Sequence, residues 1–165
     1  MYGKSFILLA ALALPLGAAG DAALDRATLK GVDAVNIVID PVSEELQHQG
    51  ATASALVTRL EDKLLKAGVK VDKNSSAFVA LRLTSVHSGR GKFIGNDQFA
   101  VAATIGLYQP VTLVRDKNIR TATQTWEVET ISLADAKQVY RACMDSVDEL
   151  AERFVTAWRS VNGQK

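Results

Sequence analysis

The glycine-rich stretch HSGRGKFIGND, residues 87–97, is the part of the sequence most suggestive of a chemically active loop. It contains Gly89, Gly91 and Gly95 beside one arginine and one lysine. Such a loop holds a phosphate when a strand leads in and a helix leads out, because the N–H groups of the helix N-terminus then face the anion. Here alternating apolar residues predict a strand on both sides, and the spacing is neither GxGxxG nor GxxxxGK[ST]. The pattern therefore favours a long hairpin loop over a nucleotide site.

The predicted tip of this loop is a candidate partner-binding site. It contains Arg90, Lys92 and Phe93, and it is longer than the usual hairpin loop of about two to five residues. Long loops that expose an aromatic ring and two bases are plausible contact surfaces. These three residues are therefore the predicted binding residues.

Histidine and serine residues offer little further chemistry. His48 and His87 are the only histidines and fall in predicted loops, where we expect them to be solvated. No group of histidine, cysteine and acidic residues has the spacing of a zinc site, so we expect neither a metal nor a cofactor. Ser85, His87 and Asp97 could form a triad on paper, but no nucleophile elbow accompanies them. We expect no catalytic residues.

Five more side chains have two interpretations each. Glu127 and Glu129 could work as paired carboxylates in hydrolysis, although two acids on one strand face favour a solvated surface. Cys143 lies on an apolar helix stripe and should be a buried, inert thiol; the alternative is a disulfide to a partner chain. Trp126 and Trp158 are predicted in the core, with an interface as the alternative.

Residues 1–19 have the pattern of a secretory signal peptide. Lys4 precedes an unbroken apolar run over residues 6–14, and small residues follow. Cleavage is expected after Ala19, with Ala22 second, and an uncleaved anchor is the alternative. No cysteine stands directly after the apolar run, so a lipobox is absent. The run is also too short to span a membrane. We expect a periplasmic or secreted protein with no membrane span after cleavage.

Composition and charge describe an ordinary globular domain. The chain has 165 residues, of which 48% are hydrophobic and 22% charged, so one domain with its own core is expected. The net charge of +1, spread over interspersed charges, argues against nucleic acid and anionic membranes as partners. A single cysteine excludes an internal disulfide.

Two amphipathic helices are predicted. Within residues 51–68, leucines recur every four residues, Thr52 or Ser54 can cap the start, and Gly68 suits the end. The last helix is expected to begin at an N-cap on Ser132, with Asp135 in its first turn, and to end before Gly163. Its apolar stripe consists of Val139, Cys143, Val147, Leu150, Phe154 and Trp158.

Alternating or β-branched apolar residues predict five strands. They lie at residues 34–40, 69–71, 77–86, 98–108 (resuming over 111–115) and 119–131. Pro110 interrupts the fourth strand and fits a bulge or an edge position. A turn is expected over residues 115–118 and a loop over 41–50.

The order β-α-β-β-β-β-α predicts an α+β fold of two layers. Both helices should pack on one face of a mainly antiparallel sheet, leaving a polar face uncovered. Residues 34–162 form this single domain, and residues 20–33 are expected to be a linker or a frayed first helix.

Three segments carry a resemblance to a family of small exported bacterial domains of unknown function. They are TRLEDKLLKAGVKV, GLYQPVTLVRD and TQTWEVETI, with residues 64–71 and 123–126 as the matching motifs. The similarity covers roughly residues 31–162 and implies no catalytic residues. The element order also resembles, at the level of fold, the outer-membrane activators of peptidoglycan synthases and the N-terminal domains of TolB-like proteins.

These observations predict a non-enzymatic exported protein that binds another envelope protein or serves as its accessory subunit. An exposed edge of the sheet could accept a strand from that partner. The alternatives are a carrier of a small apolar ligand between helices and sheet, and a hydrolase that uses the glutamates or the loop at residues 85–97.

Overall fold

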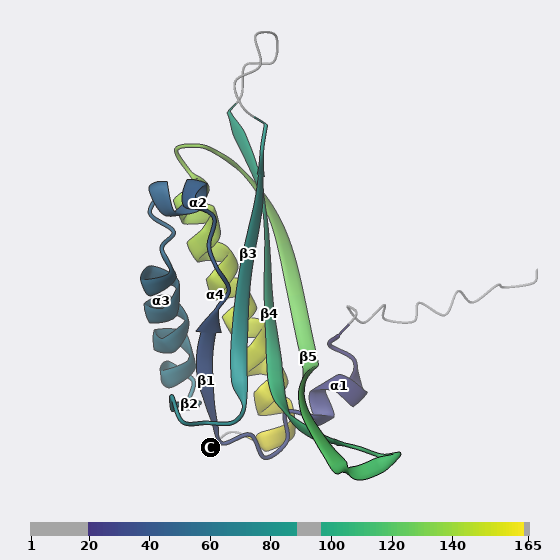
Figure 1. Ribbon diagram of the computed structural model, residues 1–165. Coiled ribbons are helices and arrows are strands. Elements are labelled where there is room, and N and C mark those ends of the chain that lie inside the picture. The colour runs from purple at the N-terminus through teal and green to yellow at the C-terminus, as the bar shows by residue number, and fades with distance from the viewer. Residues whose placement is uncertain (1–19, 89–96, 164–165) are drawn as a thin grey trace, which may run out of the picture.

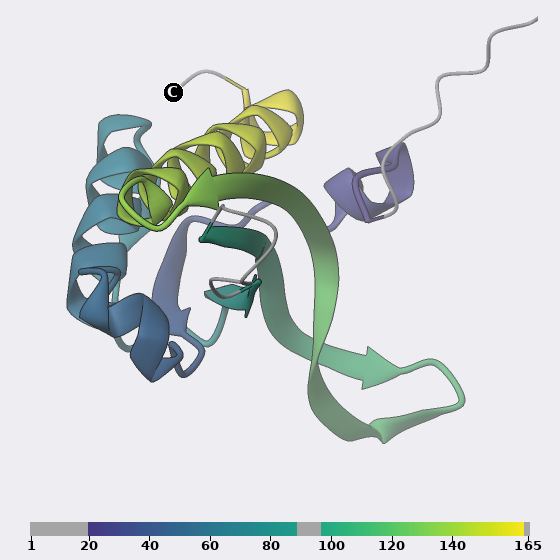
Figure 2. The same cartoon turned by 90° about the horizontal axis from the view of Figure 1, so that it is seen from above.

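The computed structural model describes residues 20–88 and 97–163, which form one five-stranded sheet with two long helices on one face (Figures 1 and 2). The elements are α1 Ala23–Ala27, β1 Ala34–Ile39, α2 Glu44–His48, α3 Ala53–Lys66, β2 Lys70–Val71, β3 Phe78–His87, β4 Gln98–Leu113, β5 Asp116–Asp135 and α4 Val139–Asn162. The strand order is β2-β1-β3-β4-β5. β1 pairs in parallel with β2 and β3, whereas β3, β4 and β5 form an antiparallel meander. The predicted two-layer α+β fold is confirmed.

The core lies between the sheet and the two helices, as the periodicity predicts. Alternate residues of β3 and β4 are buried toward α3 and α4, and Leu56, Leu60 and Leu64 of α3 are fully buried. Trp126 and Trp158 belong to this core, and the Trp126 ring meets Phe154 edge-on at 5.4 Å between ring centres. Burial of these rings accounts for a large share of the hydrophobic stabilisation.

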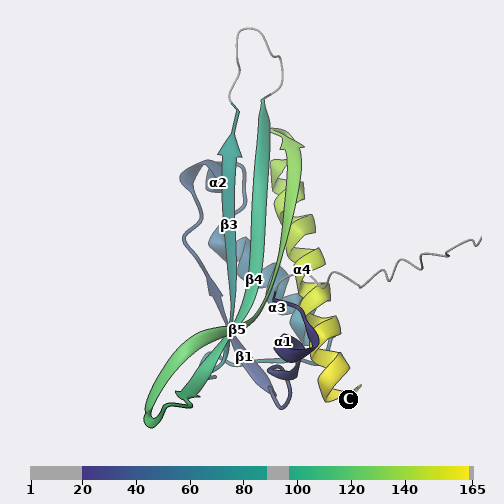
Figure 3. The same ribbon diagram turned by 90° about the vertical axis from the view of Figure 1, so that its right-hand side faces the viewer.

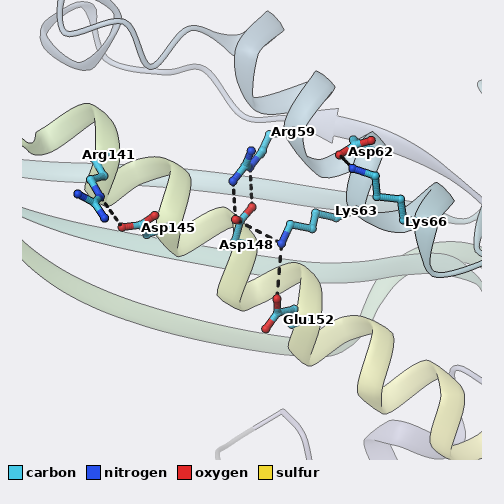
Figure 4. A network of polar contacts seen from close by, with 8 residues as sticks. All are labelled: Arg59, Asp62, Lys63, Lys66, Arg141, Asp145, Asp148 and Glu152. Carbon is cyan, nitrogen blue, oxygen red and sulfur yellow. Dashed lines mark hydrogen bonds and ion pairs between the residues drawn. The ribbon is translucent and has the colours of Figure 1, made fainter.

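An ion-pair network joins the outer surfaces of α3 and α4 (Figure 4). Arg59 Nη2 lies 2.6 Å and Lys63 Nζ 3.3 Å from Asp148 Oδ2, and Lys63 also reaches Glu152 at 3.5 Å. Partial burial raises the pKa of Asp148, but hydrogen bonds from Arg59 and Lys63 outweigh it and hold that pKa below its ordinary value. The network fixes the alignment of the two helices.

Residues 20–33 are part of the packed body rather than a linker. They contain α1, and Leu29 beyond it is fully buried. Trp158 Nε1 donates to the carbonyl oxygen of Val32 at 2.7 Å, and the side chain of Asn162 bonds main-chain groups of Leu29 and Gly31. These contacts attach the segment to the C-terminal end of α4.

Element boundaries differ from the sequence prediction on both sides of the sheet. The expected loop at residues 41–50 contains α2, which is capped by Ser43 and buries Leu46 completely. β5 continues to Asp135, because Ser132 pairs with Val101 of β4. Ser132 is therefore a strand residue and not the cap of α4, which begins at Val139.

The far ends of β4 and β5 project from the body as a two-stranded arm (Figure 3). The β4–β5 ladder shifts register between Leu107 and Tyr108, and β4 has no β3 partner beyond Tyr108. Pro110 follows this bulge on a free strand edge, as expected of a proline. The turn lies at residues 114–115, before the predicted position, because Leu113 pairs with Asp116.

Candidate functional site

The face of the sheet opposite α3 and α4 carries an exposed apolar surface at one end. The β-ladders place Val86 beside Ala100 and Ala100 beside Leu133, with Ala102 beside Ile131 in the next row. Val86, Ile131 and Leu133 are 73%, 70% and 77% exposed. We call these five residues the open-face patch. The uncovered face was predicted to be polar, and at this end that prediction is wrong.

A charged row borders the patch on the same face. Arg82 pairs in the ladder with Thr104, which in turn pairs with Glu129. Arg82 Nε also lies 2.7 Å from Asp40 Oδ2. This row separates the open-face patch from the other end of the same face, where Phe78 stacks on Tyr108 with ring centres 5.0 Å apart. Exposed apolar clusters with a polar rim mark interaction surfaces.

β5 forms one edge of the sheet, and its free side is capped only in part. The N–H of Glu127 donates to the carbonyl oxygen of Gly20 at 3.2 Å, and Arg153 Nη1 donates to the carbonyl oxygen of Glu129 at 2.8 Å. Odd-numbered residues of this part of β5 therefore direct their main-chain groups outward. Within residues 20–88 and 97–163, the outward N–H and C=O groups of Ile131 and Leu133 have no hydrogen-bond partner.

A groove of about 410 Å³ runs between this edge and the first half of α4. Figure 3 shows the upper part of β5 alongside α4. Residues 130–134 form the strand side of the groove, and Gln138, Arg141, Ala142, Asp145, Ser146 and Glu149 form the helix side. The Ser132 hydroxyl is buried here without a hydrogen-bond partner among the described residues. We call this hollow the edge groove.

His87 is exposed, as expected, but it lies in a strand rather than a loop and has three side-chain partners. It ends β3, stacks on Phe99 with ring centres 4.1 Å apart, and contacts Glu45 through Nδ1 and Asp97 through Nε2. The hydrogen bond to Asp97 raises the pKa of His87; desolvation lowers it, and the nearby charge of Glu45 raises it. The net shift is upward. His87 thus joins α2 to the β3–β4 hairpin.

The residues that the sequence offered as alternatives for catalysis form no triad among the described residues. His87 contacts Asp97, but in the described part of the chain the Ser85 hydroxyl has no hydrogen bond to His87. Glu129 is exposed and Glu127 half-buried on the open face. His48 is exposed, as expected. No group of three metal-ligating side chains occurs among the described residues.

Cys143 is fully buried on α4, and burial raises the pKa of its thiol to about 11. This environment fits the expected inert thiol. The predicted binding residues Arg90, Lys92 and Phe93 lie outside the described residues.

The sequence analysis predicted an exposed sheet edge but missed the open-face patch and the edge groove, although a signal was present. Along β5 the apolar residues Trp126 and Val128 face the core, but Thr130 and Ser132 follow on that face while Ile131 and Leu133 turn outward. This inversion of the alternating pattern marks the strand segment that lines both features.

In the described part of the chain, no helix is both long enough and apolar enough to cross a membrane. No protein-family model and no curated protein matches the sequence.

Three solved structures show a weak likeness of fold. A minor lipoprotein from Acinetobacter baumannii is 11% identical, with 79% of this chain and 93% of that chain covered and a TM-score of 0.43. PelC from Paraburkholderia phytofirmans, solved as a dodecamer, is 8% identical over 74% and 86%, with a TM-score of 0.43. Rare lipoprotein B from Shewanella oneidensis is 12% identical over 77% and 94%, with a TM-score of 0.39. Likenesses this weak carry no functional argument.

Proposed function

We propose that this protein is a non-enzymatic, exported accessory subunit that binds another envelope protein through the open-face patch. The observation that carries the proposal is the exposure of Val86, Ile131 and Leu133 together on a sheet face that no described helix covers. A single exposed apolar residue is ordinary, whereas a contiguous cluster on one face supports a docking surface. The signal-peptide pattern supports the export part of the proposal.

The two alternative functions have less support. A carrier of an apolar ligand needs an internal cavity, but one continuous cluster of buried side chains fills the space between helices and sheet in the described residues. A hydrolase needs a nucleophile or paired carboxylates in a common site, and Ser85, His87 and the two glutamates do not form one.

Affinity capture of the tagged protein from its native envelope fraction tests the proposal. We expect a stoichiometric protein partner that is lost with Leu133→Asp, because a charge would then be desolvated in the interface. Leu65→Asp is the matched control, since Leu65 is 53% exposed on α3, which covers the opposite face of the sheet. Absence of a partner, or equal capture by both variants, would overturn the proposal.

A further inference from the structure

We propose that the edge groove accepts an extended segment of the partner protein as an additional strand on β5. The segment has apolar side chains at alternate positions and carries lysine or arginine at its ends. This inference rests on the proposed function, because it describes how the partner of the open-face patch is held.

The main chain of β5 provides the first argument. Gly20 accepts from the N–H of Glu127 and Arg153 donates to the C=O of Glu129, so one outward group of each glutamate is occupied. Ile131 is the first residue at which both outward groups are open in the described part of the chain. Ile131 and Leu133 then present two donors and two acceptors at the spacing of a strand. An incoming extended chain can satisfy all four, which is how β-strand addition gains affinity.

The side walls of the edge groove provide the second argument. A strand added to β5 directs alternate side chains to the two faces of the sheet. Side chains on one face extend the open-face patch beside Ile131 and Leu133. Side chains on the other face enter the groove toward Ala142 and Ser146, which are small. The unpartnered hydroxyl of Ser132 lies on this side and offers a hydrogen bond to the incoming segment.

The charges around the edge groove indicate the flanking residues of the segment. Asp135 is exposed on β5, and Asp145 and Glu149 stand on the helix wall. Arg141 is already paired with Asp145 at 3.6 Å, and Arg153 is bound to Glu129. The four carboxylates Glu129, Asp135, Asp145 and Glu149 outnumber three basic side chains, which are these two arginines and the exposed Lys137 beyond β5. The surplus is acidic, so basic side chains complement the rim.

A second copy of this chain fits the edge less well. A symmetric antiparallel pairing of Ile131 with Leu133 places Glu129 opposite Asp135 on the same face, twice by symmetry. A pairing centred on Ile131 places Glu127 opposite Asp135, and one centred on Leu133 places Ile131 opposite Asp135. Like charges directly opposite each other destabilise the first two pairings, and the third sets an apolar side chain against a carboxylate.

A phage-displayed library of random linear peptides, selected on the immobilised protein, tests the inference. We expect enriched peptides with alternating apolar residues and basic ends. Their affinity should fall by at least about tenfold in Ile131→Pro, because proline removes an outward N–H donor. That N–H is not part of the β4 ladder, so the sheet should persist. Ile131→Val keeps both the donor and an apolar side chain, so its affinity should exceed that of Ile131→Pro by at least about tenfold.

Leu133→Pro is a second variant with the same rationale, and thermal melting identifies either proline variant that fails to fold. Amide hydrogen exchange gives an independent readout on the wild-type protein. Bound peptide should slow exchange at Ile131 and Leu133, whereas a peptide N-methylated at its edge-facing positions should not. No enriched peptide, equal binding by the folded proline variants, or unchanged exchange at both residues would overturn the inference.

The two proposals fail in different ways. An envelope partner that is captured equally well by Ile131→Pro and Ile131→Val supports the proposed function and overturns strand addition. Peptides that bind at the edge while no envelope partner is captured support strand addition and overturn the proposed function.

Discussion

Arg153 of α4 donates a hydrogen bond to the carbonyl oxygen of Glu129 on β5 at 2.8 Å and so closes the sheet edge just before Ile131. The arginine side chain is 31% exposed, and its second partner, Glu149, is 3.9 Å away. A helix residue thus binds one outward carbonyl group in the middle of the edge strand and leaves the next two outward residues, Ile131 and Leu133, open. Natural sheets protect their edges in this way where pairing is unwanted.

Arg153→Met should lower the free energy of unfolding by about 1 kcal/mol, since it removes this hydrogen bond but keeps an apolar stem. Arg141→Met is the control. Arg141 Nε lies 3.6 Å from Asp145 Oδ2, and the Arg141 side chain is 85% exposed. The free energy of unfolding should therefore fall by less than about 0.5 kcal/mol. Urea denaturation of both variants measures the difference, and equal losses would contradict the capping role.

The His87 contacts predict a pH-dependent stability. Because the pKa of His87 is raised in the folded protein, its contribution is fully present below the unfolded pKa of about 6.5 and is lost as pH rises through the folded pKa. The free energy of unfolding should therefore decline above about pH 6.5 in the wild-type protein. His87→Gln should flatten this decline, whereas His48→Gln should leave it intact. If the free energy of unfolding of His87→Gln still declines over this pH range, the pH dependence belongs to another titrating group.

The core side of α3 is tested by a pair of leucines. Leu60 is fully buried, whereas Leu65 on the same helix is 53% exposed. Leu60→Asp should destabilise the protein by about 3 kcal/mol or more, because it buries an unpaired charge. Leu65→Asp should change stability by less than about 0.5 kcal/mol. Thermal or urea melting compares them, and a normal melt of Leu60→Asp would refute the helix orientation.

The thiol of Cys143 should be unreactive in the folded protein. It is fully buried, and burial raises its pKa to about 11. Near neutral pH the thiol is therefore protonated, and reagents in solution cannot reach it. Labelling with a chromogenic disulfide reagent should proceed only as fast as the chain unfolds and should accelerate with urea. Rapid stoichiometric labelling without denaturant would show that the helix stripe opens in the native state.

Much of the fold follows from side-chain periodicity. The leucines of α3 and the alternating residues of β3 predict buried faces that the structure confirms. This works because each of these elements buries one face against the other layer, so tertiary packing and local pattern agree.

The errors occur where pattern and packing disagree. α2 has only five residues, too few to show a helical period, so the sequence pattern predicts a loop there. The end of β5 carries Thr130 and Ser132 inward and Ile131 and Leu133 outward, which resembles a strand ending and a helix cap. The candidate site lies in this same segment, because its apolar side chains face solvent and add nothing to the core that would fix the pattern.

Site-specific photo-crosslinking in the native envelope tests the central claim most directly. A benzophenone side chain at position 133 lies in the open-face patch, and one at position 65 lies on an exposed site of α3. We predict a discrete crosslinked protein of constant mass from position 133 and none from position 65. No crosslink at position 133, or the same product from both positions, would contradict the claim that this face binds an envelope partner.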